Sequence, residues 1–198
     1  MAHAAVDLTP RSLRAAPPHS PNECHEMIAL GIVTADGGRA APARGYTAAA
    51  DTVPRRAIES HDVLNDATDY ARPSSFSRGV RFDLGDTSML LISGTASIDH
   101  NGLTLYAGDF RAQLWRTYRN ITALLAAEGA TWHDIVRTSC YLRDIERDYR
   151  DFNEVRTAFF TWLGLDPLPA STGIQARLCR EDLLVEIEAM AVIPRDRR

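Results

Sequence analysis

A glutamate near the carboxyl end of the chain has the surroundings best suited to acid–base chemistry. Glu186 stands between Val185 and Ile187, in a stretch from Leu183 to Ile193 where apolar and polar side chains alternate. Such alternation predicts a β-strand. A carboxyl group partly buried there has a raised pKa, which suits proton transfer near neutral pH. The simpler alternative is a glutamate that faces solvent or pairs with an arginine.

Three residues close to Glu186 in the sequence carry groups that could bind or shape a ligand. Arg177 could grip a carboxylate through two parallel N–H···O bonds, or form a salt bridge with Glu188. Glu188 is most simply interpreted as the partner of an arginine at a subunit contact. Cys179 could be a nucleophile, but no histidine lies near it in the sequence to activate it, which favours a pocket-lining role.

Two residues at the end of an earlier apolar run offer hydrogen-bond donors. Ser93 and Gly94 follow the run that begins at Met89, and their hydroxyl and backbone N–H groups could hold a carboxylate or an oxyanion. The alternative is an ordinary turn in which Gly94 supplies only a permissive backbone. The histidines show no metal-ligand spacing and the sequence has no glycine-rich phosphate loop, so we expect neither a metal nor a cofactor.

The composition excludes several other classes of function. The 198 residues are 45% hydrophobic and 24% charged, which is typical of a globular protein, and the net charge of −4 does not favour nucleic acid. The sequence contains no lysine, which excludes a lysine Schiff base. Three cysteines make no disulfide framework. Without an apolar run of about 20 residues or a secretory signal, the chain is predicted to be cytoplasmic, with no membrane partner.

The elements that must position these groups follow from periodicity and capping residues. Strands are predicted over residues 79–84, 89–93, 103–106, 135–142, 171–178 and 183–193, and the apolar run 27–33 could be another. Asp109 and Asp148 are interpreted as the residues that open two amphipathic helices, the second of which is closed by Gly164.

The chain changes character near Pro73. Seven of its ten prolines lie at or before this residue, so residues 1–73 are predicted to be a partly ordered Pro/Ala/Gly-rich extension and residues 74–198 the main domain. The domain is predicted to be α+β, with a single mixed sheet of about six strands and two helices on one face, because two helices cannot cover both faces. Sister subunits are expected to bury the other face.

Four segments, in order, resemble the RidA superfamily, also called YjgF or endoribonuclease L-PSP. They are residues 91–94 (LISG) with the following turn, 138–142 (TSCYL), 151–160 (DFNEV…FF) and 176–189 (ARL…LVEIEA). The resemblance implies a RidA-like, chorismate-mutase-like fold, a homotrimer, and active clefts between neighbouring subunits. It also implies that Glu186 transfers a proton and that Asn153 hydrogen-bonds the substrate.

Three features depart from the deaminating members of that superfamily, one of which is an extra residue between Arg177 and Glu186. Ala170 stands where they carry the arginine that holds the substrate carboxylate, and Phe76 takes the place of a tyrosine. Within the superfamily the motifs are more similar to the C-terminal half of chorismatases. That resemblance adds Cys179 and Thr172 as pocket-lining residues. It rests on residues 93–97 (SGTAS), 169–174 (PASTGI) and 179–186 (CREDLLVE).

The implied function is protonation by Glu186 of an enol-ether or enamine double bond in a small organic acid, followed by water addition and C–O or C–N cleavage. Arg177, Ser93 and Gly94 would anchor the carboxylate. Chorismatase-like hydrolysis is the first expectation and imine or enamine deamination the second, both without a cofactor. The alternative, which the changes at positions 170 and 76 favour, is a non-catalytic homotrimer that binds a metabolite or a partner protein.

Overall fold

A computed structural model describes residues 20–36, 38, 52–71 and 73–196. The chain forms two compact units, Met1–Thr52 and Val53–Arg198. In the first unit, helix α1 spans Pro21–Ala29 and begins with a reciprocal cap, in which Ser20 and Glu23 each accept the other's backbone N–H. The strand considered for residues 27–33 was therefore wrong, because this cap and the proline in the first turn favour a helix.

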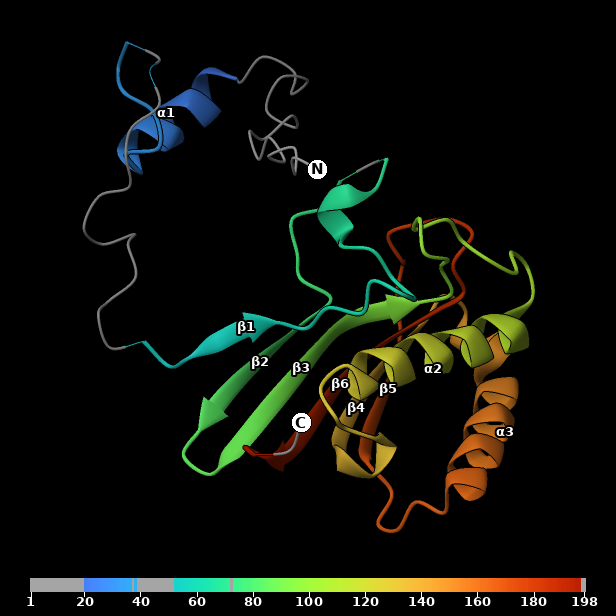
Figure 1. Cartoon of the computed structure of the whole chain (residues 1–198). Helices are drawn as coiled ribbons and strands as arrows, with labels where there is room; N and C mark the ends of the chain where they lie inside the picture. The colour runs from blue at the N-terminus through green and yellow to red at the C-terminus, as the bar shows by residue number, and fades with distance from the viewer. Residues whose placement is uncertain (1–19, 37, 39–51, 72, 197–198) are drawn as a thin grey trace, which may run out of the picture. The chain divides into compact units, whose positions relative to one another are not determined.

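Six strands of the second unit form one mixed sheet, in the order β1-β2-β3-β6-β4-β5 (Figure 1). Strands β4 and β5 run parallel, and every other neighbouring pair runs antiparallel. This arrangement confirms the predicted fold class. The strands are β1 Arg55–Ala57, β2 Gly79–Leu84, β3 Thr87–Ala96, β4 Ile135–Leu142, β5 Ala170–Gln175 and β6 Val185–Pro194.

Two long helices cover one face of this sheet, as predicted (Figure 1). Helix α2 spans Phe110–Ala126 and begins at Asp109, whose side chain accepts the N–H of Ala112. Leu114 and Ile121 are fully buried on the apolar side of α2. Helix α3 spans Ile145–Leu163 and lies beside α2. No helix in the described part of the chain has the length and apolar character of a membrane span.

Helix α3 begins earlier than predicted. Asp144, not Asp148, is its cap and accepts the N–H of Arg147 at 3.1 Å. Strand β4 ends at residue 142, so the first aspartate after the strand is already placed to start the helix. Asp148 instead lies buried inside the helix, where it forms an ion pair of 2.6 Å with Arg147. Gly164, in the left-handed conformation, ends the helix as predicted.

Four strand predictions in this unit need correction, the first of which is the strand over residues 89–93, which extends to 87–96 as β3. Residues 103–106 form no strand, and Thr104 makes a single bridge with Ile98. Strand β5 runs from residue 170 to 175 and strand β6 begins at residue 185, so both differ from the predicted bounds. Between them the chain turns, and the Arg143 guanidinium donates to the carbonyl groups of Arg180 and Leu183. Those carbonyls are satisfied by a side chain, so they need no strand partner.

The unit that holds the sheet begins at Val53, earlier than the predicted boundary after residue 73. Ile58 and Leu64 belong to its main core and are almost completely buried. Glu128, buried in the turn after α2, forms an ion pair with Arg56 on β1. Residues 53–71 are thus packed into the sheet unit, because they contribute both core side chains and the partner of a buried charge.

The side chains of strand β6 alternate between the core and the opposite face of the sheet. Its odd-numbered residues, such as Val185 and Ile187, are buried, whereas Glu186, Glu188 and Met190 alternate with them and are half-buried or exposed. This confirms the predicted alternation. Val185 and Ile187 share a core cluster with side chains of α2, so Glu186, which alternates with them, projects from the face that α2 and α3 do not cover, called here the helix-free face.

Candidate active site

A pocket of about 410 Å³ lies on the helix-free face, next to the ends of β3 and β6. Four of the predicted site residues line it. Ser93 and Gly94 come from β3, Glu186 comes from β6, and Cys179 comes from the connection that precedes β6. The antiparallel pairing of β3 with β6 brings these residues together although about 90 positions separate them in the sequence.

The Glu186 carboxyl lies directly against the backbone of Gly94. The β3–β6 register shifts between Ile92 and Thr95, so Ser93 and Gly94 form an irregularity opposite Glu188, whereas Glu186 pairs with Ala96. A Cβ atom at residue 94 would lie 2.0 Å from Glu186 Oε1, which is far inside van der Waals contact. Glycine is therefore needed here for close approach. The Ser93 hydroxyl, in contrast, donates to the Ser77 carbonyl at 2.8 Å.

The surroundings of Glu186 raise the pKa of its carboxyl group. Burial is the largest cause, since it disfavours the charged form, and the charge of Glu188 adds to it. The nearby Arg180 guanidinium opposes both effects. Glu188 itself is exposed and accepts a hydrogen bond of 2.9 Å from the Tyr141 hydroxyl. A carboxyl that retains its proton to higher pH can act as a general acid.

Two arginines that the sequence analysis did not select also line the pocket. Arg78 is only 5% exposed, and its guanidinium carbon lies 4.8 Å from the ring centroid of Tyr70 and 5.3 Å from that of Phe76. Burial lowers the pKa of Arg78. Arg180 donates to the Gly102 carbonyl. The position of Arg180 inside the 179–186 motif was a usable signal, whereas no local pattern marks Arg78.

Three other predicted residues do not line this pocket in the single chain. Arg177 is exposed. Thr172, on β5, accepts a hydrogen bond of 3.2 Å from Arg137. Asn153, on α3, donates to the Tyr149 carbonyl and accepts from Arg156, so both ends of its amide are engaged within the helix.

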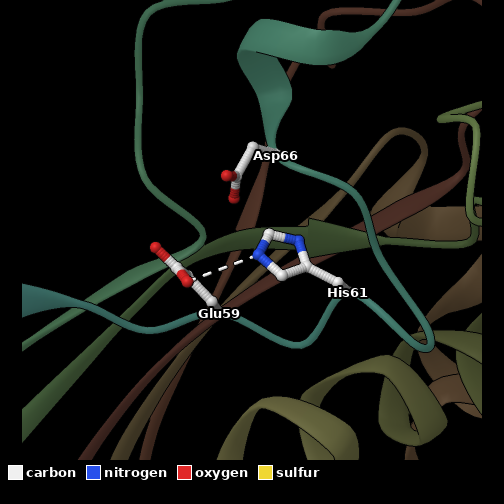
Figure 2. Close-up of side chains that lie close together, drawn as sticks. All are labelled: Glu59, His61 and Asp66. Carbon is white, nitrogen blue, oxygen red and sulfur yellow. Dashed lines mark hydrogen bonds and ion pairs between the residues drawn. The ribbon is translucent and has the colours of Figure 1, made fainter. Parts of the chain in front are cut away.

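A second group of polar side chains lies outside the pocket, on the segment between β1 and β2. Figure 2 shows Glu59, His61 and Asp66, whose potential ligand atoms all lie within 4.8 Å of one another. Glu59 and His61 are exposed and share a hydrogen bond of 3.3 Å. The three groups could hold a metal ion. They are equally explained as a surface hydrogen bond beside an acidic residue.

Comparison with known proteins agrees with this fold. A model of the family described as endoribonuclease L-PSP matches residues 70–193. A RutC family protein of Pyrococcus abyssi is 30% identical over 104 residues, which are 52% of this chain and 78% of that protein. The 2-iminobutanoate/2-iminopropanoate deaminase of Salmonella typhimurium is 33% identical over 110 residues, which are 56% of this chain and 82% of that protein.

Solved structures give the same result. The crystal structure of the YjgF gene product from E. coli has a TM-score of 0.55 and 28% identity, and the match covers 69% of this chain and 98% of that one. The structure of E. coli TdcF with bound serine has a TM-score of 0.57 and 26% identity, with 70% and 98% coverage. The family match over most of the sheet unit therefore shows that this chain belongs to the endoribonuclease L-PSP family, also known as the RidA/YjgF family.

Proposed function

We propose that this protein is a cofactor-independent enzyme in which Glu186 donates a proton to an enamine or enol-ether double bond of a small carboxylic acid. The position of the Glu186 carboxyl supports this proposal most directly. It is partly buried against Gly94, its pKa is raised, and it faces a pocket large enough for a small organic acid. A general acid of this kind typically contributes 10²–10⁴-fold in rate, as an order-of-magnitude figure.

The proposed reaction needs only the Glu186 carboxyl group, the substrate and water. Proton transfer from Glu186 to the terminal carbon of an enamine forms a new C–H bond and leaves an iminium ion. Water adds to the iminium carbon, and its extra proton returns to the Glu186 carboxylate. The resulting carbinolamine loses ammonia by C–N cleavage and becomes a 2-oxo acid. An enol ether reacts in the same way through an oxocarbenium ion and loses an alcohol by C–O cleavage.

Imine or enamine acids are the substrates that the relatives favour, since the Salmonella typhimurium protein is named a 2-iminobutanoate/2-iminopropanoate deaminase. Chorismatase-like hydrolysis is the second candidate. It is favoured by the 179–186 motif, which places Cys179, Arg180 and Glu186 around one pocket. It is also favoured by Ala170, which lies in the chorismatase-like 169–174 motif and takes the place of the arginine of the deaminating relatives.

Glu186→Gln tests the proposed role of the carboxyl group, and assays with two substrates distinguish the two candidate reactions. We expect the unaltered chain to release 2-oxo acid from 2-iminopropanoate generated in the assay, or pyruvate from chorismate, and Glu186→Gln to lose about 10²–10⁴-fold of that activity. Glu146→Gln, an exposed position on α3, is the matched control and should retain full activity. Equal turnover by the unaltered chain and Glu186→Gln would refute the proposal. A chain that turns over neither substrate would favour a non-catalytic binding protein.

A further inference from the structure

Arg78 is a buried cation that no carboxylate of the described residues pairs with. Its Nε group donates to the Asn65 carbonyl at 3.1 Å, and one Nη group donates to the Tyr70 hydroxyl. A guanidinium has five N–H groups, so three of them have no acceptor among the described residues. A buried charge is costly unless it is paired and hydrogen-bonded. An arginine that is only 5% exposed therefore calls for an anion from outside the chain.

The aromatic rings beside Arg78 hold its guanidinium in place. The ring centroids of Tyr70 and Phe76 lie 4.8 Å and 5.3 Å from its central carbon, within the range of a cation–π contact. The Tyr70 ring is itself fixed, because it packs against Gly102, where a Cβ atom would overlap the ring. A guanidinium held in this way loses little further freedom when it binds a ligand.

The pocket carries both cationic and acidic side chains. Arg78 and Arg180 line the same cavity as Glu186 and Glu188, and the charge of Arg180 acts on Arg78 as well as on Glu186. Arg78 is not among the groups that shift the pKa of Glu186. The charge of Arg78 can therefore serve a ligand without suppressing the ability of Glu186 to hold its proton.

We infer that Arg78 binds the carboxylate of the substrate, with Tyr70 and Phe76 as its positioning residues. This inference rests on the proposed function for its substrate class. The planar fork of an arginine matches the two oxygens of a carboxylate. Because Arg78 and Glu186 line the same pocket, one bound substrate can contact both residues.

Binding of pyruvate, a simple 2-oxo acid, tests the inference without requiring turnover. We expect calorimetry to detect pyruvate binding to the full chain and to Glu186→Gln. Arg78→Met should weaken binding by about 10- to 100-fold, and Arg78→Lys by less, since the charge remains but the fork is lost. Arg150→Met, an 89% exposed arginine side chain on α3, is the matched control and should bind as tightly as the unaltered chain.

Tyr70→Phe is a second variant, for the case in which Arg78→Met fails to fold. It removes only the hydroxyl group that accepts a hydrogen bond from Arg78. It should raise KM several-fold and leave kcat nearly unchanged. Undiminished pyruvate binding by a folded Arg78→Met, or no binding by the unaltered chain, would overturn the inference. Arg78-dependent binding in a chain that lacks turnover would uphold the carboxylate site while rejecting the proposed reaction.

Discussion

At the scale of single residues, two glutamates on one strand show how placement sets chemistry. Glu186 and Glu188 point to the same face of β6, yet Glu186 is half-buried whereas Glu188 is exposed. The negative charge of Glu188 makes ionisation of Glu186 less favourable, and Arg180 only partly offsets this effect. The site thus keeps one carboxyl protonated to higher pH with the help of another, as acid–base centres commonly require.

The raised pKa of Glu186 has a cost in stability that can be measured. The ordinary pKa is 4.5 and the folded value is higher, so the folded state loses stability as pH rises from below 4.5 through the folded pKa. Glu186→Gln lacks this charge. Its free energy of unfolding should therefore exceed that of the unaltered chain at pH 7 to 8.

Urea unfolding of both proteins between pH 3.5 and 8 measures this difference. The gap should shrink as the pH falls towards 4.5 and vanish below it, where both side chains are neutral. A gap of the opposite sign at neutral pH would mean that Glu186 is stabilised as a carboxylate in the folded protein.

The site could be predicted from the sequence only in part. Glu186 was predicted because it is a carboxyl group inside an alternating strand pattern. Gly94 was predicted because it follows an apolar run directly. Arg78 was missed because its burial depends on Tyr70 and Phe76, which have no periodic relation to it. Asn153 was selected by resemblance alone, and in the folded chain its amide is engaged by neighbours on its own helix.

At the scale of elements, the glycine in the irregular part of β3 leaves room for the Glu186 carboxyl group. Gly94→Ala would place a methyl group 2.0 Å from Glu186 Oε1, so the carboxyl must move. The displaced atom is the end of a flexible side chain, so we expect the protein to fold with nearly unchanged thermal stability. Activity should fall by about 100-fold, as it would on loss of a well-placed acid.

Gly173→Ala is the matched control for this change. Gly173 is also a strand glycine, but a Cβ atom there would meet only the edge of the Tyr149 ring, at 4.0 Å. The two alanine variants should therefore have similar melting temperatures and very different activities. Full activity in Gly94→Ala would show that the position of the Glu186 carboxyl against residue 94 is unimportant for the reaction.

Elements whose signals are local were predicted well. The alternation in β6 and the Asp109 cap of α2 depend on near neighbours, and both are present. Asp148 was mistaken for a cap because Asp144 offers the same chemistry four residues earlier, and only the end of β4 decides between them. The place of residues 53–71 was missed for a similar reason. One of the contacts that attach them to the sheet unit is the ion pair of Arg56 with Glu128, which is distant in the sequence.

At the scale of the whole molecule, the helix-free face of the sheet remains to be explained. A second hollow of about 410 Å³ lies on it and shares Ser93 and Glu188 with the candidate active site. Leu91, Val80 and Met190 contribute apolar side chains to this hollow, and Leu91 is 39% exposed. Such a surface is typical of one that another chain covers. We propose that three copies of the protein bury this face against one another.

Leu91→Arg tests that assembly. Size-exclusion chromatography with light scattering should give the mass of three chains for the unaltered protein and of one chain for Leu91→Arg. The arginine would place an unpaired charge in the buried interface, which is costly. Trp162→Arg, at a 78% exposed position on α3, is the control and should remain trimeric. A cleft shared between copies would lose one wall on dissociation, so Leu91→Arg should also lose activity although Glu186 is intact. A monomeric unaltered protein, or a trimeric Leu91→Arg, would contradict the assembly and leave the pocket to function within one chain.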